Sequence, residues 1–358
     1  MAPQLRPSRR TRVNMTATSP DRPLANATPR MWTRRAILSA LQSPPLASSD
    51  AWIRLSRGAM ACSFEVTLAS EDAGGVPASR AALDSVDRIE DHLTIFRSTS
   101  AISEINRQAA DSPVVIDQPL FDLLRECVEI HRTTAGAFDI TSTPLSRCWG
   151  FLQRSGRLPS AQAIDAARMN VGLDGVVLDA PSSTVRFSRK GIELNLGAIG
   201  KGYALDRVGA EMRAAGVRHA LLSAGHSSLL ALGGRDGGWS IELTSPLADA
   251  VLARVWLRDG GIGTSGAGEQ FVEVEGVRYG HVIDPRSGWP ASTMVSATVI
   301  AGRAASADAL STAFLIGGPA LACDYCASHP DTLAIMTPQG YRTPIVIGRH
   351  PRARVEVV

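Results

Sequence analysis

The sequence predicts an α+β fold, because its helix-like and strand-like segments gather in separate blocks rather than alternating strictly. Helical periodicity dominates between about residues 83 and 134, whereas short apolar segments separated by Gly- and Pro-rich turns dominate from 220 to 301. The 358 residues suffice for one large domain or two smaller ones with real cores.

The first 50 residues read as an unstructured segment, since they are rich in Pro, Arg, Ser and Thr and show little apolar periodicity. Within them, Thr33-Arg34-Arg35-Ala36-Ile37-Leu38 is similar to a twin-arginine export signal. The apolar stretch that follows ends before Pro44-Pro45 and is shorter than the core of such a signal. Export and a cytoplasmic location therefore both stay open. No apolar run approaches the length of a membrane span.

Two amphipathic helices are expected in the first half of the globular part. The first ends near Phe96 and places four apolar residues on one face: Leu83, Val86, Ile89 and Leu93. The second runs from about 119 to 134 and stops at Ala135-Gly136. The remaining elements expected here are a strand over 64–68, a short helix over 100–106 and a hairpin over 176–178 and 184–187.

Short strands are expected to dominate the second half. Two helices interrupt them, at 203–215 and 305–315. Residues 350–358 are expected to form a C-terminal tail. The predicted strands cover 220–223, 229–232, 239–243, 251–257, 271–274, 277–279 and 295–301, with a final pair within 332–347.

The composition excludes several classes of function. Net charge is only +3, and the basic excess lies before residue 60, so a nucleic-acid-binding surface is not expected. Five cysteines are too few for a disulfide scaffold. Cys323 and Cys326 form a C-x-x-C pair with His329 close behind, but a zinc site would need a second pair of ligands.

The most informative stretch is Asn195-Leu-Gly-Ala-Ile-Gly-Lys-Gly-Tyr-Ala-Leu-Asp206, which joins a short apolar strand candidate to a helix. Its glycines lack a Cβ and would let the backbone approach a ligand closely. Lys201 adds positive charge where a helix start presents free N–H groups, which suits a phosphate. An ordinary Gly-rich connection is the alternative. The spacing fits neither a P-loop nor the GxGxxG fingerprint.

Two further segments carry groups suited to chemistry. In His281-Val-Ile-Asp284-Pro-Arg-Ser-Gly288, a strand breaks into a turn with a histidine and an aspartate three residues apart. Asp308 and Thr312 are four residues apart and share one helical face, where their oxygens could bind a hard divalent cation. Taken alone, an aspartate such as Asp308 at a helix start is more often a cap or dipole partner, and a histidine such as His281 is more often structural.

Taken together and in this order, these segments resemble one family, the FAD:protein FMN transferases, also called ApbE-type flavin transferases. The resemblance extends over about residues 52–348. Further support comes from Thr134-Ala-Gly-Ala-Phe-Asp139, Pro144, Trp149-Gly150 and Trp239. The most specific pieces are Gly197-Ala-Ile-Gly-Lys-Gly-Tyr203, Thr264-Ser-Gly266, the segment 281–288 and Ala307-Asp-Ala-Leu-Ser-Thr312.

The resemblance implies a T-fold-related α+β architecture of mixed sheets and packed helices, in a single large catalytic domain over 51–349. It implies Mg2+-dependent transfer of FMN from FAD, the substrate, to a Thr or Ser hydroxyl of an acceptor flavoprotein, with release of AMP. FAD and this acceptor are thus the expected partners. The acceptor's identity and the oligomeric state do not follow from the sequence.

The resemblance also assigns residues to the site. Asp308, the Thr312 hydroxyl and the backbone carbonyl of Ala198 match metal ligands. Lys201 matches a contact to FAD and, beside magnesium, would neutralise charge on phosphoryl oxygens. Because a threonine hydroxyl is a poor nucleophile at neutral pH, a base should help, and both His281 and Asp284 are candidates. The other positions matching the flavin-nucleotide site are Met60, Phe96, Ala137, Phe138, Asp139 and Asn195.

Three positions depart from the family's pattern. Asn195 stands where Asp is usual, Met60-Ala61-Cys62 replaces Met-Gly-Thr, and Ala224-Gly225-His226 replaces Gly-Gly-Asn or Gly-Gly-Asp. The metal pair and Lys201 are retained, which favours an active transferase. The alternatives are an FAD pyrophosphatase, in which water replaces the acceptor and FMN and AMP are released, and a non-catalytic FAD-binding protein.

Overall fold

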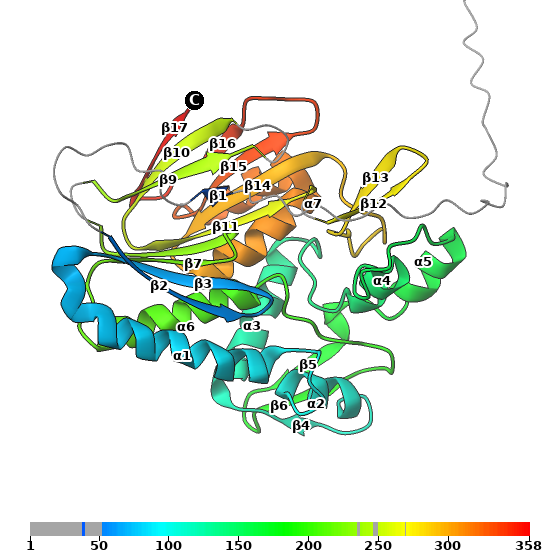
Figure 1. The fold of residues 1–358 in the computed structure, drawn as a ribbon. Coiled ribbons are helices and arrows are strands. Elements are labelled where there is room, and N and C mark those ends of the chain that lie inside the picture. The colour runs from blue at the N-terminus through cyan, green and yellow to red at the C-terminus, as the bar shows by residue number, and fades with distance from the viewer. Residues whose placement is uncertain (1–37, 40–51, 235–236, 246–249, 269) are drawn as a thin grey trace, which may run out of the picture.

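An eight-stranded antiparallel sheet forms the centre of the fold (Figure 1). The computed structural model describes residues 38–39, 52–234, 237–245, 250–268 and 270–358. The predicted unstructured segment and its twin-arginine-like motif therefore lie outside the described residues, apart from 38–39. The strands of the central sheet follow the order β16 (Ile345–Gly348), β15 (Leu333–Pro338), β14 (Met294–Ala301), β11 (Gly260–Gly266), β8 (Ser228–Leu232), β7 (Ala220–Ala224), β3 (Cys62–Ala69) and β2 (Trp52–Ala59).

A four-stranded sheet covers one face of the central sheet (Figure 1). Buried side chains from both sheets meet between them, among them Ile241 and Val255 from the smaller sheet and Leu229 and Ile262 from the larger one. Apolar surface is thereby removed from water on both inner faces, as in other packed sheets. The order of the smaller sheet is β1 (Leu38–Ser39), β9 (Trp239–Thr244), β10 (Val251–Leu257) and β17 (Ala353–Val357).

Three helices cover the opposite face of the central sheet: α1 (Val76–Leu93), α6 (Gly200–Ala214) and α7 (Ala304–Ser328). The central strands are therefore buried on both faces. In β8, Leu230 and Leu232 pack with the helices, whereas Leu229 and Ala231 pack with the second sheet. This two-sided burial explains why β8 is apolar from Leu229 to Leu232 rather than alternating with polar residues.

The remaining elements lie at the helical side and at one end of the sheet (Figure 1). Trp149 and Phe151 anchor a small separate core at that end, packed between α5 and the hairpin β12–β13. The described elements not yet given are η1 (Ser70–Gly75), α2 (Ala101–Gln108), β4 (Val114–Val115), α3 (Gln118–Thr133), α4 (Thr143–Cys148), α5 (Ala161–Arg168), η2 (Leu173–Gly175), β5 (Val176–Asp179), β6 (Thr184–Phe187), β12 (Phe271–Val274) and β13 (Val277–Gly280).

The predicted α+β class is confirmed, and most predicted helices and strands have counterparts close to their expected positions. Four predictions need correction. The apolar strand candidate that precedes the loop 195–201 forms no strand. The strands β1, β2, β4 and β11 and the short helices α4 and α5 were not predicted. α7 does not end at 315 but continues to Ser328, across a kink at Gly318 where φ is +71°. The expected C-terminal tail instead contains β17, which pairs with β10.

Strand β11 was missed because its sequence, Gly-Gly-Ile-Gly-Thr-Ser-Gly, is poor in strand-forming residues. The structure shows why glycine is needed. A Cβ on Gly261 would lie 2.4 Å from the Ala304 Cα, and one on Gly263 would lie 2.3 Å from the Ala307 carbonyl oxygen. These glycines therefore let α7 lie directly against β11. The next residue on the same face of the strand is Ser265, which contacts α7 within the site described below.

Of the described helices, α7 alone is long and apolar enough to cross a membrane, by length and composition. This differs from the expectation that no apolar run approaches such a length. Half of the relevant window is buried inside the protein, and α7 packs against β11, β14 and α6. The helix α7 is thus packed against the sheet and a neighbouring helix in the manner of a core helix.

Ala61 occupies a backbone conformation that favours glycine. The turn between β2 and β3 has two central residues, Met60 and Ala61, with φ of +48° and +57°. Two successive positive φ angles are typical of a type I′ hairpin turn, in which Asn and Gly are preferred. The family pattern has glycine at this position, so the departure at Ala61 places a Cβ in a backbone conformation where it is strained.

We expect Ala61→Gly to raise the free energy of unfolding by about 1 kcal/mol, because it removes the Cβ repulsion of the left-handed conformation. Urea denaturation followed by circular dichroism measures this change. Ala59→Gly, at the end of β2, is the matched control and should lower the free energy of unfolding by roughly 0.5–1 kcal/mol. Equal changes in the two variants would contradict the explanation.

Candidate active site

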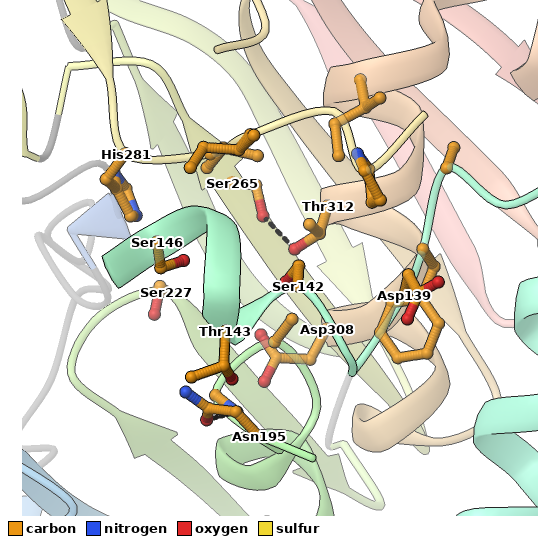
Figure 2. Close-up of a pocket in the computed structure, with 18 of the residues that line it drawn as sticks. Asp139, Ser142, Thr143, Ser146, Asn195, Ser227, Ser265, His281, Asp308 and Thr312 are labelled. Atoms are coloured by element: carbon orange, nitrogen blue, oxygen red, sulfur yellow. Dashed lines mark hydrogen bonds between the residues drawn. The ribbon is translucent and has the colours of Figure 1, made fainter. Parts of the chain in front are cut away.

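Two adjoining cavities flank the loop between Asn195 and Lys201. The first has a volume of about 290 Å3 and the second about 270 Å3, and Asn195, Gly197 and Lys201 line both. Of the residues predicted for the site, Met60 and Phe96 line the second cavity. The first cavity is lined by Ala137, Phe138, Asp139, Ala198, His281, Asp308 and Thr312 (Figure 2). The loop thus separates two compartments that share one lysine.

Asp308 is a buried carboxylate, 4% exposed, in the second turn of α7. The Gly202 amide donates to its Oδ2 at 3.1 Å, and the Ser228 hydroxyl donates to its Oδ1 at 2.9 Å. The two bonds come from α6 and β8 and fix the direction of the carboxylate relative to the first cavity. The positive end of the α7 dipole also favours an anionic group near this end of the helix.

Thr312 lies one turn further along α7 and faces the same cavity. Its hydroxyl lies 3.0 Å from the Ser265 hydroxyl (Figure 2). The Ser265 hydroxyl in turn lies 2.8 Å from the Ser311 hydroxyl. Asp308, Thr312 and Ala198 therefore offer only oxygen atoms as ligands, the kind that Mg2+ prefers. No cluster of three or more His, Cys, Asp or Glu suited to a metal occurs among the described residues. Such a sparse set fits Mg2+, which keeps waters and substrate phosphates in its shell.

Lys201 is the second residue of α6, and its ammonium group donates to the Ser227 hydroxyl. Asn195 folds back on its own loop, because its side-chain oxygen accepts a 2.9 Å hydrogen bond from the Gly197 amide. An aspartate could accept the same bond. The asparagine side chain at 195 can therefore keep the hydrogen bond that an aspartate would make, while it removes one negative charge near Lys201.

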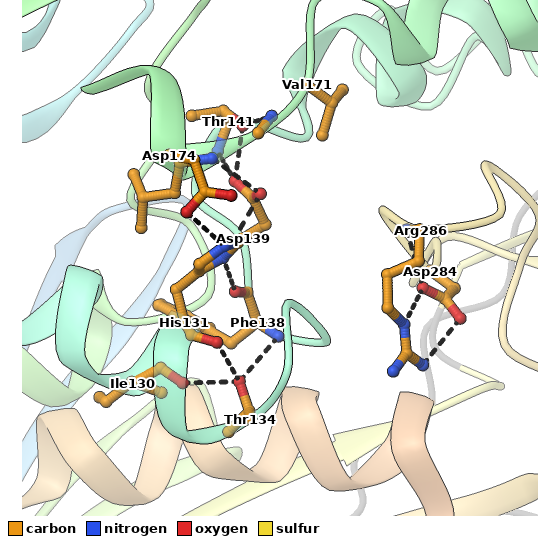
Figure 3. Close-up of polar contacts among 12 residues, drawn as sticks. Ile130, His131, Thr134, Phe138, Asp139, Thr141, Val171, Asp174, Asp284 and Arg286 are labelled. Atoms are coloured by element: carbon orange, nitrogen blue, oxygen red, sulfur yellow. Dashed lines mark hydrogen bonds and ion pairs between the residues drawn. The ribbon is translucent and has the colours of Figure 1, made fainter.

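The loop 137–139 is fixed by a network behind the cavity (Figure 3). Oδ1 of Asp139 accepts hydrogen bonds from the amide and the hydroxyl of Thr141, at 2.7 and 2.6 Å. Oδ2 accepts from the Leu173 amide at 3.2 Å and lies 3.5 Å from His131 Nδ1. Asp139 was predicted to contact the flavin nucleotide. Although it lines the first cavity, these bonds show that its carboxylate also holds the loop in place.

The two candidate bases are placed differently. His281 lines the first cavity, and its Nδ1 lies 3.3 Å from the Gln270 carbonyl. Asp284 is not among the residues that line either described cavity. Its carboxylate accepts from the side chain of Arg286 at 2.8 and 2.9 Å (Figure 3). The structure therefore brings His281, but not Asp284, together with Lys201 and Asp308.

Sequence reasoning gave no site role to six other hydroxyl-bearing residues that line the first cavity: Ser142, Thr143, Ser146, Ser227, Thr264 and Ser265. Thr264 and Ser265 belonged to a motif already singled out, Thr264-Ser-Gly266, so a signal existed. The others lie in segments without a recognisable spacing, and only the fold brings them to one cavity. In the C-x-x-C pair, Cys323 is exposed and Cys326 is buried, and both are free thiols.

Asp206 fixes the start of α7, although it belongs to α6. Its Oδ1 accepts from the Ala304 amide at 2.9 Å and its Oδ2 from the Ala305 amide at 3.1 Å. Arg303, the residue at the N-cap position of α7, has no side-chain cap hydrogen bond of its own. Asp206 therefore serves as the cap from a neighbouring helix. The same helix α7 carries Asp308 and Thr312.

We expect Asp206→Asn to lower the free energy of unfolding by about 1–2 kcal/mol, because the amide nitrogen cannot accept the second hydrogen bond. Burial raises the pKa of Asp206 above its usual value of 3.8. The native carboxyl therefore binds its proton more tightly than the unfolded one, and its contribution to stability decreases as the pH rises from about 3.8 through the raised pKa.

Urea denaturation at several pH values between 3.5 and 8 tests both the loss of stability in Asp206→Asn and the pH dependence of the contribution from Asp206. The stability difference between the wild type and Asp206→Asn should shrink as the pH rises through this window. Asp165→Asn on the exposed face of α5 is the control and should change stability little. A difference that grows with pH would contradict the sign of the pKa shift.

The fold and the cavities together define an α+β protein with a hydroxyl-rich site, suited to a phosphate-bearing ligand and a hard cation. The chain belongs to the ApbE family, whose family model matches residues 60–337. This confirms the resemblance found in the sequence motifs.

Curated relatives and solved structures agree with this assignment. An FAD:protein FMN transferase of Escherichia coli (strain K12) is 30% identical over 266 residues, covering 72% of this chain and 75% of the relative. One from Treponema pallidum (strain Nichols) is 31% identical over 282 residues, covering 74% and 77%. The crystal structure of the ApbE protein of Thermotoga maritima MSB8 superposes with a TM-score of 0.74 at 28% identity, covering 84% of this chain and 97% of that one. The apo flavinyl transferase ApbE of Pseudomonas stutzeri gives 0.69 at 28% identity, covering 84% and 95%.

Proposed function

We propose that this protein is an Mg2+-dependent FAD:protein FMN transferase, which passes FMN from FAD to a Thr or Ser hydroxyl of an acceptor protein and releases AMP. The observation that supports this most strongly is that Lys201, Asp308 and Thr312 face one cavity, which adjoins a second cavity across the loop 195–201. Two compartments sharing Lys201 suit a dinucleotide whose pyrophosphate lies near the lysine.

The residues present suit each part of the reaction. Asp308, Thr312 and the Ala198 carbonyl would hold Mg2+, which supplies positive charge where negative charge builds on the phosphoryl oxygens. Lys201 adds a second positive charge. The second cavity is more apolar, with Met60, Leu93, Ile95 and Phe96 among its lining residues, so it suits a ring system.

The transfer requires one bond to form and one to break. The acceptor hydroxyl oxygen attacks the phosphorus of the FMN half, and the bond from that phosphorus to the bridging oxygen breaks, so that AMP leaves with this oxygen. The hydroxyl proton passes to a base. We assign this role to His281 rather than Asp284. A carbonyl can only accept, so in a neutral imidazole the contact with Gln270 favours the proton on Nδ1 and makes Nε2 the basic nitrogen.

The test is to incubate the purified protein with FAD, MgCl2 and an acceptor domain carrying a Ser/Thr flavinylation motif, and to measure the acceptor by intact-mass spectrometry. A mass gain of one FMN that disappears with EDTA would support the proposal. Release of FMN and AMP with an unmodified acceptor would instead indicate the pyrophosphatase. Intact FAD retained on the protein would indicate a binding protein without catalysis.

A further inference from the structure

Thr143 carries a buried hydroxyl group that has no hydrogen-bond partner within the part of the chain that the structure describes. The residue is 2% exposed and is the first residue of α4. Its side chain lines the first cavity (Figure 2). Buried polar groups are nearly always hydrogen-bonded, so an unpaired hydroxyl on a cavity wall indicates a partner that arrives with a ligand.

The surroundings of Thr143 fit a polar ligand. Ser142 and Ser146 flank it in sequence and line the same cavity, and Asn195 and Asp308 line it as well. Figure 2 shows Thr143 between Ser142 and Asn195. Because the Thr143 hydroxyl gives up no hydrogen bond within the described structure, it can rotate about χ1 toward a ligand, and threonine in helices populates two such rotamers.

We propose that Thr143 is a substrate-binding residue whose hydroxyl hydrogen-bonds to an oxygen of the sugar–phosphate part of bound FAD. This inference rests on the proposed function, because it takes FAD as the ligand of the first cavity. The other hydroxyls of the wall are in part already engaged: Ser227 accepts from Lys201, and Ser265 bonds to Ser311 and Thr312. Thr143 differs from Ser142 and Ser146 in that its unpaired hydroxyl is buried, so its partner arrives with the substrate.

This role predicts opposite effects of one substitution on the free and the bound protein. In the free protein the unpaired hydroxyl is destabilising, because it has lost its hydrogen bonds to water without replacement. Thr143→Val keeps the shape of the side chain and removes the hydroxyl. It should therefore stabilise the free protein and weaken FAD binding, a combination that a purely structural role does not produce.

The experiment compares full-length wild-type, Thr143→Val and Thr143→Ser proteins by thermal unfolding without ligand and by calorimetric titration with FAD, FMN and AMP in Mg2+. For Thr143→Val we expect the Tm of the free protein to rise by roughly 2–4 °C. The Kd for FAD should increase about tenfold. Thr143→Ser retains a hydroxyl and should keep FAD affinity near the wild-type value. Whichever of FMN or AMP loses affinity identifies the half of FAD that Thr143 contacts.

Ser79→Ala is the matched control. Ser79 is fully buried in α1, and its hydroxyl donates to the Gly75 carbonyl at 2.9 Å, so its loss should lower the Tm and leave FAD affinity unchanged. An unchanged Kd for FAD in Thr143→Val, with a wild type that binds FAD, would overturn the inference. An unchanged Tm would also overturn it, because the hydroxyl would then be satisfied in the free protein. A wild type that binds no FAD would contradict the proposed function itself.

Discussion

Asp308→Asn is expected to abolish FMN transfer while leaving the fold intact. Asparagine has the same shape as aspartate, its oxygen can accept from the Gly202 amide, and its amide can donate to the Ser228 hydroxyl, so these two hydrogen bonds can be kept. The negative charge offered to Mg2+ is lost. We expect the rate of transfer to fall at least 100- to 1,000-fold, as when a group that stabilises transition-state charge is removed.

Three measurements separate loss of chemistry from loss of fold: the rate of acceptor flavinylation, the affinity for Mn2+ by electron paramagnetic resonance, and the urea midpoint. Asp308→Asn should lose acceptor flavinylation and Mn2+ affinity but keep the urea midpoint of the wild type. Asp259→Asn is the matched control, since it makes the same charge change in the turn before β11, away from both cavities. If Asp308→Asn transferred FMN within about threefold of Asp259→Asn, a metal role for Asp308 would be wrong.

Local patterns were sufficient to predict much of the fold. The amphipathic helices α1 and α3 were recognisable because Leu83, Val86 and Leu93 in α1, and similar residues in α3, recur at helical spacing. The family resemblance carried by the ordered motifs between 195 and 312, rather than their local geometry, predicted that these segments meet at one site. Asp308 and Thr312 share one face simply because they lie four residues apart on α7.

Long-range contacts could not be predicted in this way. Asp206 caps α7 from α6, 98 residues earlier in the chain, and no spacing rule connects the two segments. Asp139 has an acidic side chain in a loop, which is compatible with ligand binding and with loop support alike. Only the positions of Thr141 and Leu173 reveal the second role. Thr143 has no motif, and its significance depends on a missing hydrogen bond that becomes visible only after folding.

The glycines of the loop 195–203 show the same limit. Sequence reasoning assigned all of them to close approach by a ligand. In the structure, Gly202 allows close approach by α7, because a Cβ there would lie 2.2 Å from the Ala304 carbonyl oxygen and 2.5 Å from its carbon. A Cβ on Gly200 would meet only the Leu196 Cβ, at 4.0 Å. Two glycines separated by a single residue thus have different roles.

Gly202→Ala should therefore damage both stability and activity. The added methyl group must push α7 away from α6, which overpacks the interface and should lower the free energy of unfolding by about 3 kcal/mol. The same shift displaces Asp308, whose Oδ2 accepts from the Gly202 amide. We expect FMN transfer to fall at least tenfold even at a temperature where the variant is fully folded, since a small misplacement of a catalytic group has large kinetic effects.

Gly200→Ala provides the comparison, because it adds the same methyl group to the same helix two residues earlier. Alanine is the better helix former by about 1 kcal/mol, so this variant should be as stable as the wild type or more stable. Urea denaturation of the two variants measures the contrast directly. If both lost stability equally, the loop itself would require glycine at each position, and close packing of α6 on α7 would not be the reason for glycine at 202.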